Sequence, residues 1–114
     1  MAAVTITVDS AETFKQRANA AFAGKRQPER ISFESFDVLW KVLAPNRMSL
    51  VQTLTGSGPV SLREAARLVG RDVRAVHSDV HMLLQAGVLR RVEDGRIEFP
   101  YTAVHVDFML RSAT

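Results

Sequence analysis

Cysteine is absent from the 114 residues of this chain. Disulfide bonds, thiolate-ligated zinc and cysteine nucleophiles are therefore excluded, and the composition is compatible with a reducing compartment. Long apolar runs are also missing, since no segment approaches the roughly 18 apolar residues that a membrane-spanning helix needs. Residues 1–10 lack the basic and apolar regions of a secretory signal. These absences predict a soluble, cytoplasmic protein.

Catalytic and cofactor-binding motifs are lacking as well. The sequence contains no glycine-rich phosphate loop, no G-x-S-x-G nucleophile motif and no H-E-x-x-H metal motif. His77 and His81 stand four residues apart, a spacing that can hold a metal, and His105 is a third imidazole elsewhere. A stable zinc site takes three or four ligands, and no Glu or Cys stands at the required spacing. We therefore expect no enzymatic activity, no cofactor and no metal.

The arginine residues are more informative than the total charge. A net charge of +3 is too small to indicate nucleic-acid binding by itself, in a chain whose size and composition fit one globular domain. Arg63, Arg67, Arg71 and Arg74 lie within twelve residues, whereas every lysine precedes position 42. The planar guanidinium group suits phosphate and guanine recognition. A GC-rich genome, which favours arginine codons, is the alternative explanation.

Residues 60–89 show the pattern of two short helices joined by a tight turn. Ser61 and Glu64 have the spacing of a capping box, which marks a helix start, and Gly70 is typical of a helix end. Asp72 is suited to cap the second helix, which Gly87 ends. The first helix, between its start at Ser61 and its end at Gly70, carries an apolar stripe of Leu62, Ala65, Ala66 and Val69.

The second helix of this pair has two chemically different faces. We expect an inward face of Val73, Val76, Val80, Leu83 and Leu84. The outward face is rich in groups that donate hydrogen bonds to phosphates and to the guanine edge in the major groove. Asp79, an acid at its edge, can either orient an arginine or discriminate against phosphate. This outward face comprises Arg71, Arg74, Ser78 and His81, with His77 at its flank.

Alternating apolar segments flank Asp94-Gly95, which is the strongest short signal for a β-hairpin. We expect Val60 to add a third strand to this hairpin. Arg90, Arg91 and Arg96 lie within it, so we expect a basic ribbon directly after the second helix.

A helix-turn-helix followed at once by such a hairpin resembles the winged helix-turn-helix transcriptional regulators of the MarR and ArsR kind. The ending YTAVHVDFML is similar to a family of small prokaryotic predicted DNA-binding regulators, some of them encoded beside a toxin-like protein. The resemblance implies an α+β, mainly α fold: a winged helix-turn-helix with a C-terminal β-hairpin wing and flanking terminal segments for dimerisation. The matching positions are Ala66, Val69, Gly70, Val76, Val80, Leu83 and Gly87, followed by the hairpin.

The resemblance and the arginine-bearing face together imply double-stranded DNA as the partner and autorepression as the role. Helix 72–86 would enter the major groove, with Arg74 and Ser78 at base edges, and the wing 88–99 would contact the backbone or minor groove. Each contact residue could instead be an ordinary solvated residue, and Ser61 could serve as a cap alone. The predicted contact residues are Ser61, Arg63, Arg71, Arg74, His77, Ser78, His81, Arg90, Arg91 and Arg96.

The chain ends each carry a strand pattern, over residues 4–8 and 101–110. An isolated strand tends to pair, so we expect these two to pair within one chain or across a homodimer. A capping box of Asp9 and Glu12 predicts a helix to Ala23, with a narrow apolar seam suited to a dimer interface. Residues 1–30 would then form a dimerisation extension and residues 31–114 the winged-helix domain. The alternative is that the terminal segments only cover the core of a monomer.

Between these parts, we expect an extended segment at 31–33 and two further helices. Ser35 is suited to cap the first, whose Phe36, Leu39, Trp40 and Leu43 have core spacing, and Pro45 is suited to begin the second, which runs through Leu54.

A second function from a different class also fits the sequence. Winged helices serve as protein-interaction modules, and the resemblance of the C-terminal segment implies an antitoxin that neutralises a toxin-like partner. Its binding surface would be the terminal strands or the N-terminal helix rather than residues 71–81, with or without operon autorepression.

Overall fold

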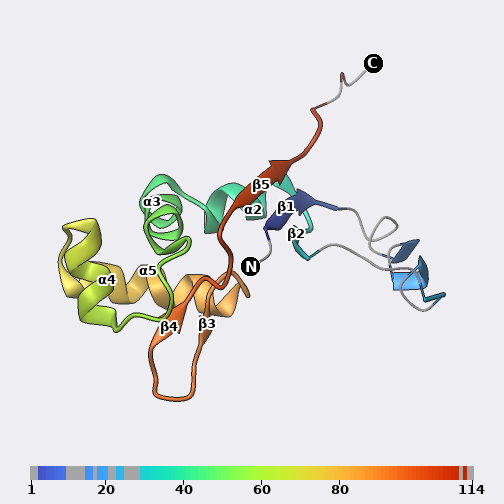
Figure 1. The fold of residues 1–114 in the computed structure, drawn as a ribbon. Coiled ribbons are helices and arrows are strands. Elements are labelled where there is room, and N and C mark those ends of the chain that lie inside the picture. The colour runs from blue at the N-terminus through green and yellow to red at the C-terminus, as the bar shows by residue number, and fades with distance from the viewer. Residues whose placement is uncertain are drawn as a thin grey trace.

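The computed structural model of the chain describes residues 3–9, 15–16, 18–20, 23–24, 29–110 and 112. The fold is α+β, with a small parallel sheet on one side and a group of helices with an antiparallel ribbon on the other (Figure 1). The strands are β1 (Val4–Val8), β2 (Arg30–Phe33), β3 (Arg90–Arg91), β4 (Ile97–Glu98) and β5 (Val104–Asp107). The helices whose bounds lie within the described residues are α2 (Phe36–Val42), α3 (Pro45–Leu54), α4 (Leu62–Val69) and α5 (Val73–Gln85).

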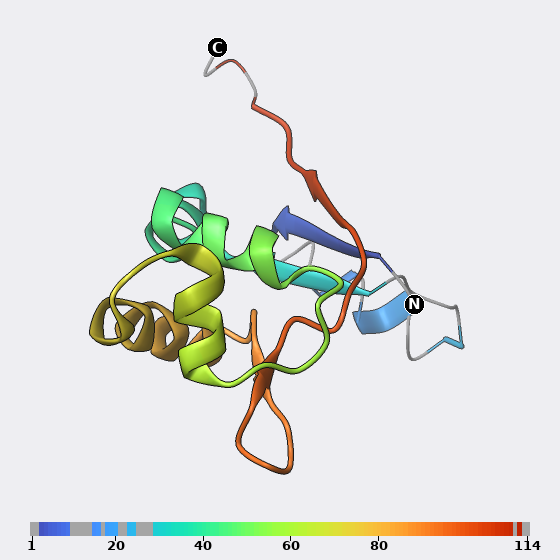
Figure 2. The same cartoon turned by 60° about the vertical axis from the view of Figure 1, so that its left-hand side comes forward.

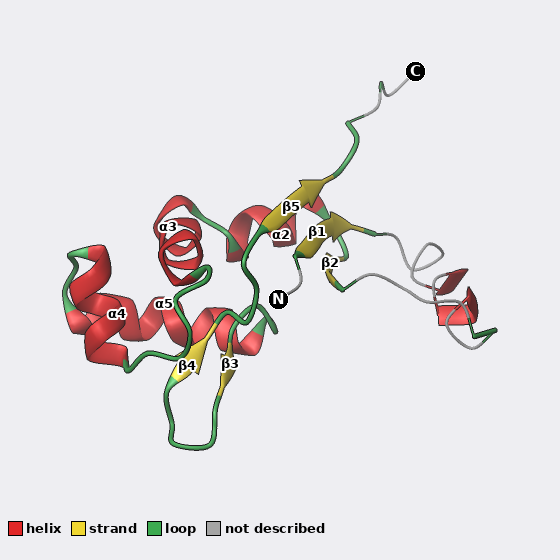
Figure 3. Ribbon diagram, viewed as in Figure 1, coloured by secondary structure: helices red, strands yellow, loops and turns green. Residues whose placement is uncertain are grey.

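The parallel sheet has the order β2-β1-β5, so the first strand lies between strands from the middle and the end of the chain (Figure 3). Ile6 is in register with Ile31 on one side and with Val106 on the other. The predicted pairing of the terminal strands is confirmed, and it occurs within one chain. The C-terminal strand covers only Val104–Asp107 and not the whole segment 101–110.

One hydrophobic core joins the sheet to the helices. Two side chains predicted to be in it are outside: Trp40 is 56% exposed and Val73 is 41% exposed. Trp40 lies beside Leu39, which faces inward, and its ring instead meets Phe108 edge-on at 6.0 Å. Val73 is in the first turn of α5, before that helix reaches the core. The largest fully buried side chains are Phe99, Ile6, Leu39, Leu50, Leu54, Leu83, Ile97, Val4, Val51 and Val76.

Local capping sets the ends of α4 and α5, as predicted. The Ser61 hydroxyl accepts a hydrogen bond from the Glu64 N–H at 3.1 Å, and the Asp72 carboxylate accepts one from the Arg74 N–H at 3.1 Å. Gly70 ends α4 with φ of +68°, a left-handed conformation that glycine adopts without steric cost. Pro45 stands at the start of α3. The turn between α4 and α5 is therefore fixed by its own residues.

Strands β3 and β4 form an antiparallel pair, called here the β3–β4 ribbon (residues 90–98). Arg90 is opposite Glu98, and the turn closes with a 2.8 Å hydrogen bond from Val92 N–H to the Arg96 carbonyl. Val60 makes an isolated antiparallel bridge to Ile97, through two backbone hydrogen bonds of 2.9 Å. The predicted third strand is therefore a single bridge. The ribbon projects downward from the helices in Figures 1 and 2.

Most of the helix predicted over residues 9–23 lies outside the described residues, as does its role at a dimer interface. Asp9 itself is buried and accepts hydrogen bonds from the hydroxyls of Thr7 at 2.6 Å and Ser32 at 2.7 Å. These contacts join the end of β1 to β2. Among the described helices, none has the length and apolarity to cross a membrane.

Candidate nucleic-acid interface

The outward face of α5 is not covered by the rest of the described chain. Arg74, His77, Ser78 and His81 are all exposed, and within the described residues their side chains make no hydrogen bond or ion pair. Arg74 and Ser78 are four residues apart, so they lie one above the other on the same face. The opposite face of α5 enters the core through Val76, Val80 and Leu83.

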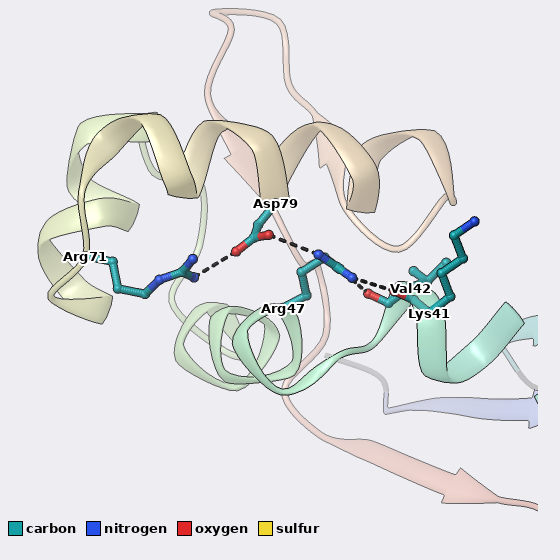
Figure 4. A network of polar contacts seen from close by, with 5 residues as sticks. All are labelled: Lys41, Val42, Arg47, Arg71 and Asp79. Atoms are coloured by element: carbon teal, nitrogen blue, oxygen red, sulfur yellow. Dashed lines mark hydrogen bonds and ion pairs between the residues drawn. The ribbon is translucent and has the colours of Figure 1, made fainter. Parts of the chain in front are cut away.

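Arg71 differs from these four residues because an acid of α5 holds it. Its Nη1 atom lies 2.8 Å from Asp79 Oδ2, in an ion pair that does not have hydrogen-bond alignment (Figure 4). The Arg71 side chain is 26% exposed and that of Asp79 is 10% exposed. The predicted position of Asp79 at the edge of the outward face is wrong, because α5 turns this carboxylate toward α3. Its predicted ability to orient an arginine fits this contact.

The second Asp79 oxygen accepts a hydrogen bond from Nη1 of Arg47, on α3, at 3.1 Å. Arg47 also donates through Nε to the Val42 carbonyl at 2.6 Å and through Nη2 to the Lys41 carbonyl (Figure 4). These carbonyls belong to the last turn of α2, where helix geometry leaves them without a partner in the helix. One carboxylate therefore links α2, α3, α5 and the α4–α5 turn. The sequence pattern did not indicate Arg47, although a basic residue soon after a helix end is a common partner for such carbonyls.

The arginines of the β3–β4 ribbon have local partners. Arg90 Nε lies 2.7 Å from Glu98 Oε1, and Arg96 Nε lies 2.6 Å from Asp94 Oδ2. The backbone N–H of Arg96, followed by its guanidinium, holds the pKa of Asp94 below the ordinary value although burial opposes this, so Asp94 is ionised at neutral pH.

Arg91 donates only to a carbonyl, that of Gly95, at 2.9 Å. It is therefore the one ribbon arginine whose charge no described acid pairs with. The prediction of a basic ribbon is wrong, because its three positive charges are balanced by Glu93, Asp94 and Glu98.

The first turn of α4 offers an exposed cation beside free backbone donors. Arg63 is exposed, and its side chain makes no hydrogen bond or ion pair within the described part of the chain. Ser61 is half-buried, and its hydroxyl oxygen already accepts the capping bond. At the start of α5, by contrast, the exposed carboxylate of Asp72 would repel a phosphate. An anion is therefore better suited to the start of α4 than to the start of α5.

A hollow of about 230 Å³ lies between α5 and the β3–β4 ribbon. It brings His77 and His81 of α5 together with Arg91 of the ribbon, and no acidic side chain is among its described lining residues. No set of three described His, Asp or Glu residues is placed to hold a metal ion. The rest of the lining is mostly apolar: Leu62, Val80, Leu84, Gly95 and Ile97.

Residues 42–106 match the family model described as HVO_A0114, over more than half of the chain. The chain belongs to the HVO_A0114 family. The HVO_A0114 segment runs from the end of α2 to Val106 in β5 and contains every predicted contact residue. Comparison with curated proteins and with solved structures finds no match.

Proposed function

We propose that this HVO_A0114 protein is a sequence-specific double-stranded DNA-binding transcription regulator that acts as a homodimer, most simply as a repressor of a neighbouring operon. In this proposal the fold is a winged helix-turn-helix. Helices α4 and α5 are its helix-turn-helix, α5 is the recognition helix, and the β3–β4 ribbon is the wing. The observation that carries the proposal is the uncovered outward face of α5, with Arg74, His77, Ser78 and His81 exposed beside the ribbon.

In this proposal, Arg74 and Ser78 would recognise the bases. A guanidinium fork can donate two parallel hydrogen bonds to O6 and N7 of guanine, and a hydroxyl can donate to or accept from a neighbouring base. Because Arg74 is free of acidic partners in the described chain, it needs to break no contact to reach a base. An α-helix fits the width of the major groove, so both side chains can reach adjacent base pairs.

Backbone contacts would come from the edges of this face and fix its register on the duplex. Arg91, His77 and His81 surround the hollow between α5 and the ribbon and could donate to one strand. Arg63 and the backbone donors of α4 could hold another phosphate. Arg71 would still add positive potential beside the groove, because Asp79, which holds it in place, is shared with Arg47. Glu98 and Asp94 neutralise Arg90 and Arg96, so we expect these two arginines to contribute less to backbone binding than Arg91.

The experiment is a selection of binders from a random double-stranded DNA library, followed by gel-shift titration of the selected duplex at two salt concentrations. We expect a defined sequence to be enriched and its affinity to fall steeply with salt, because phosphate contacts release counterions. Lys41→Ala is the matched control, since it removes an exposed positive charge from α2, outside this face. Failure to enrich any sequence, with no gel shift at low salt, would contradict the proposal.

The second candidate function is a protein-interaction module or antitoxin that neutralises a toxin-like partner. It is favoured by apolar side chains after β5, where Met109 is 67% exposed and Leu110 is 77% exposed. Arg74→Ala separates the two functions, since it should weaken binding to the selected DNA sequence and leave association with a protein partner intact. Loss of the partner with retention of DNA binding would reverse the assignment of the two surfaces.

A further inference from the structure

β5 is an edge strand of the parallel sheet in the described part of the chain, and its sequence is complementary to itself in antiparallel orientation. We propose that two copies of this chain join through β5, antiparallel, with Val106 on the twofold axis. This inference rests on the proposed function, because the interface is the one through which the proposed homodimer would form. Its test uses no DNA, so that the failure of either proposal can be told from the failure of the other.

The backbone of β5 has one paired side and one free side. Val4 N–H donates to the Ala103 carbonyl at 3.1 Å, so the backbone groups of Ala103, and of His105 and Asp107 at alternate positions, face β1. Those of Val104 and Val106 face away from β1, where the described chain has no further strand. An edge of this kind favours pairing with another strand. In an antiparallel pair, outward-facing residues exchange both hydrogen bonds, so Val106 can pair with its own copy.

This register places His105 of each copy opposite Asp107 of the other. Both residues are exposed, and they would occupy the non-hydrogen-bonded positions, where opposing side chains are closest. An imidazole N–H can donate to a carboxylate in either protonation state of the ring. A register centred on Asp107 would instead oppose two carboxylates, which is destabilising. The pattern His105-Val106-Asp107 therefore favours the register centred on Val106.

The apolar side of β5 extends the same interface. Val104 and Val106 lie in register with Val4 and Ile6, which are fully buried, but Val106 is 43% exposed. Val104 and Val106 border a hollow of about 340 Å³ against Met48 and Val51 of α3. A second β5 would bring its own valines to this side and cover Val106.

The residue after β5 strengthens this apolar side. The Phe108 ring packs edge-on against Phe36 at 5.0 Å and Trp40 at 6.0 Å. In the register centred on Val106, Phe108 of one copy is opposite Val104 of the other. Two exposed side chains adjoin these contacts. The Trp40 ring meets that of Phe108, and Met109 follows Phe108 in the chain.

The position of β5 is compatible with DNA binding. Figures 1 and 2 show β5 on the side of the molecule opposite the β3–β4 ribbon, with residues 108–110 leading further away from it. Pairing through β5 therefore leaves the outward face of α5 free in both copies.

The first test measures mass by sedimentation equilibrium. The wild-type chain of 12.6 kDa is expected at twice that mass in the micromolar range. Val106→Glu is expected to be monomeric. Asp107→Lys should raise the dimer dissociation constant roughly tenfold, because each of the two symmetric pairs loses the carboxylate that accepts from His105. His105→Asp combined with Asp107→Lys should restore it, and circular dichroism checks that each variant is folded.

Several outcomes would overturn the interface. The first is a wild-type chain that is monomeric throughout the micromolar range. The second is a dimer whose association Asp107→Lys does not weaken. The third is a double variant that associates more weakly than Asp107→Lys alone. A folded chain that associates only with a different protein through β5 would also overturn it.

The second test uses the absence of cysteine, which removes any background of crosslinking. Paired residues of the hydrogen-bonded type have Cα atoms about 5.5 Å apart, within the range of roughly 4.4–6.8 Å that a disulfide spans. Val106→Cys is therefore expected to form a covalent dimer under mild oxidation. Ser49→Cys, exposed on α3, is the control and should remain a single chain. Equal crosslinking of both variants would contradict the interface.

Discussion

Arg71, in the turn before α5, forms an ion pair of 2.8 Å with Asp79, in the second turn of α5, and Asp79 also accepts a hydrogen bond from Arg47. An arginine of the predicted DNA-contacting set is thus held by an acid of the helix that follows it, and Arg47 of α3 in turn holds that acid. The orientation of α5 and the position of Arg71 therefore depend on one carboxylate.

The first prediction concerns the stability that this carboxylate provides. Asp79→Asn should lower the free energy of unfolding by about 2 kcal/mol, because it leaves two partly buried arginines without a counter-charge. The loss is smaller than for a fully buried ion pair, because both arginines are partly exposed to solvent. Urea denaturation followed by circular dichroism measures it. Glu93→Gln, on the exposed ribbon turn, is the control and should change stability by less than about 0.5 kcal/mol. Equal midpoints for Asp79→Asn and wild type would contradict the structural role of Asp79.

The second prediction separates the ribbon arginines. Arg91→Ala should weaken binding to all DNA sequences alike and reduce the slope of log affinity against log salt by about 1, because it removes one phosphate contact. Arg90→Ala should have a smaller effect, since Glu98 already balances its charge. Gel shifts at several salt concentrations compare the two variants. Equal losses would show that the ion pair to Glu98 does not withhold Arg90 from DNA.

The third prediction tests whether Glu98 keeps the positive charge of Arg90 from contacting DNA. Glu98→Gln removes the acid that pairs with Arg90 at 2.7 Å and leaves a side chain of the same shape. DNA affinity should rise and its salt dependence should steepen, because one more cation becomes available to the backbone. Combining Glu98→Gln with Arg90→Ala should cancel the gain. A gain that persists in the double variant would mean that Glu98 acts by general repulsion and not through Arg90.

The fourth prediction concerns alkaline pH. Burial raises the pKa of Tyr101 above its ordinary 10.0, and the hydrogen bond that its hydroxyl donates to Glu29, at 3.1 Å, raises the pKa further. Because the folded-state pKa is the higher one, this contribution to stability is complete below pH 10.0 and is lost as pH rises through the folded-state pKa. Tyr101→Phe should flatten the fall in unfolding free energy above pH 10.0. An identical pH profile for both proteins would contradict this assignment.

The boundaries of α4 and α5 were predictable from sequence because their determinants are local. Ser61, Gly70 and Asp72 act on backbone groups within four residues of themselves. The pattern of buried valines and leucines in α5 follows in the same way from helical spacing. Only Val73 departs from it, because the first turn of the helix extends beyond the core.

The pairing of the two terminal strands was predictable from their strand patterns, but the side-chain contacts between distant segments were not. Arg47 and Asp79 are 32 residues apart in sequence. The position of Arg47 soon after a helix end indicates a bond to carbonyls of that helix, but not the contact with Asp79. Trp40 had core spacing, but its exposure depends on where β5 and Phe108 lie. The charge balance of the ribbon is different, because Glu93, Asp94 and Glu98 could be counted in the sequence; the pairing of Arg90 with Glu98 required the strand register.

The central claim is that the outward face of α5 reads DNA sequence, and the affinity of Arg74→Ala for single-base variants of the selected duplex tests it most directly. We expect a loss of roughly 1–3 kcal/mol on the selected sequence and relaxed discrimination at one base pair, with other positions unchanged. Lys41→Ala should match wild type. A loss for Arg74→Ala that is equal on every duplex, or no loss at all, would contradict the claim.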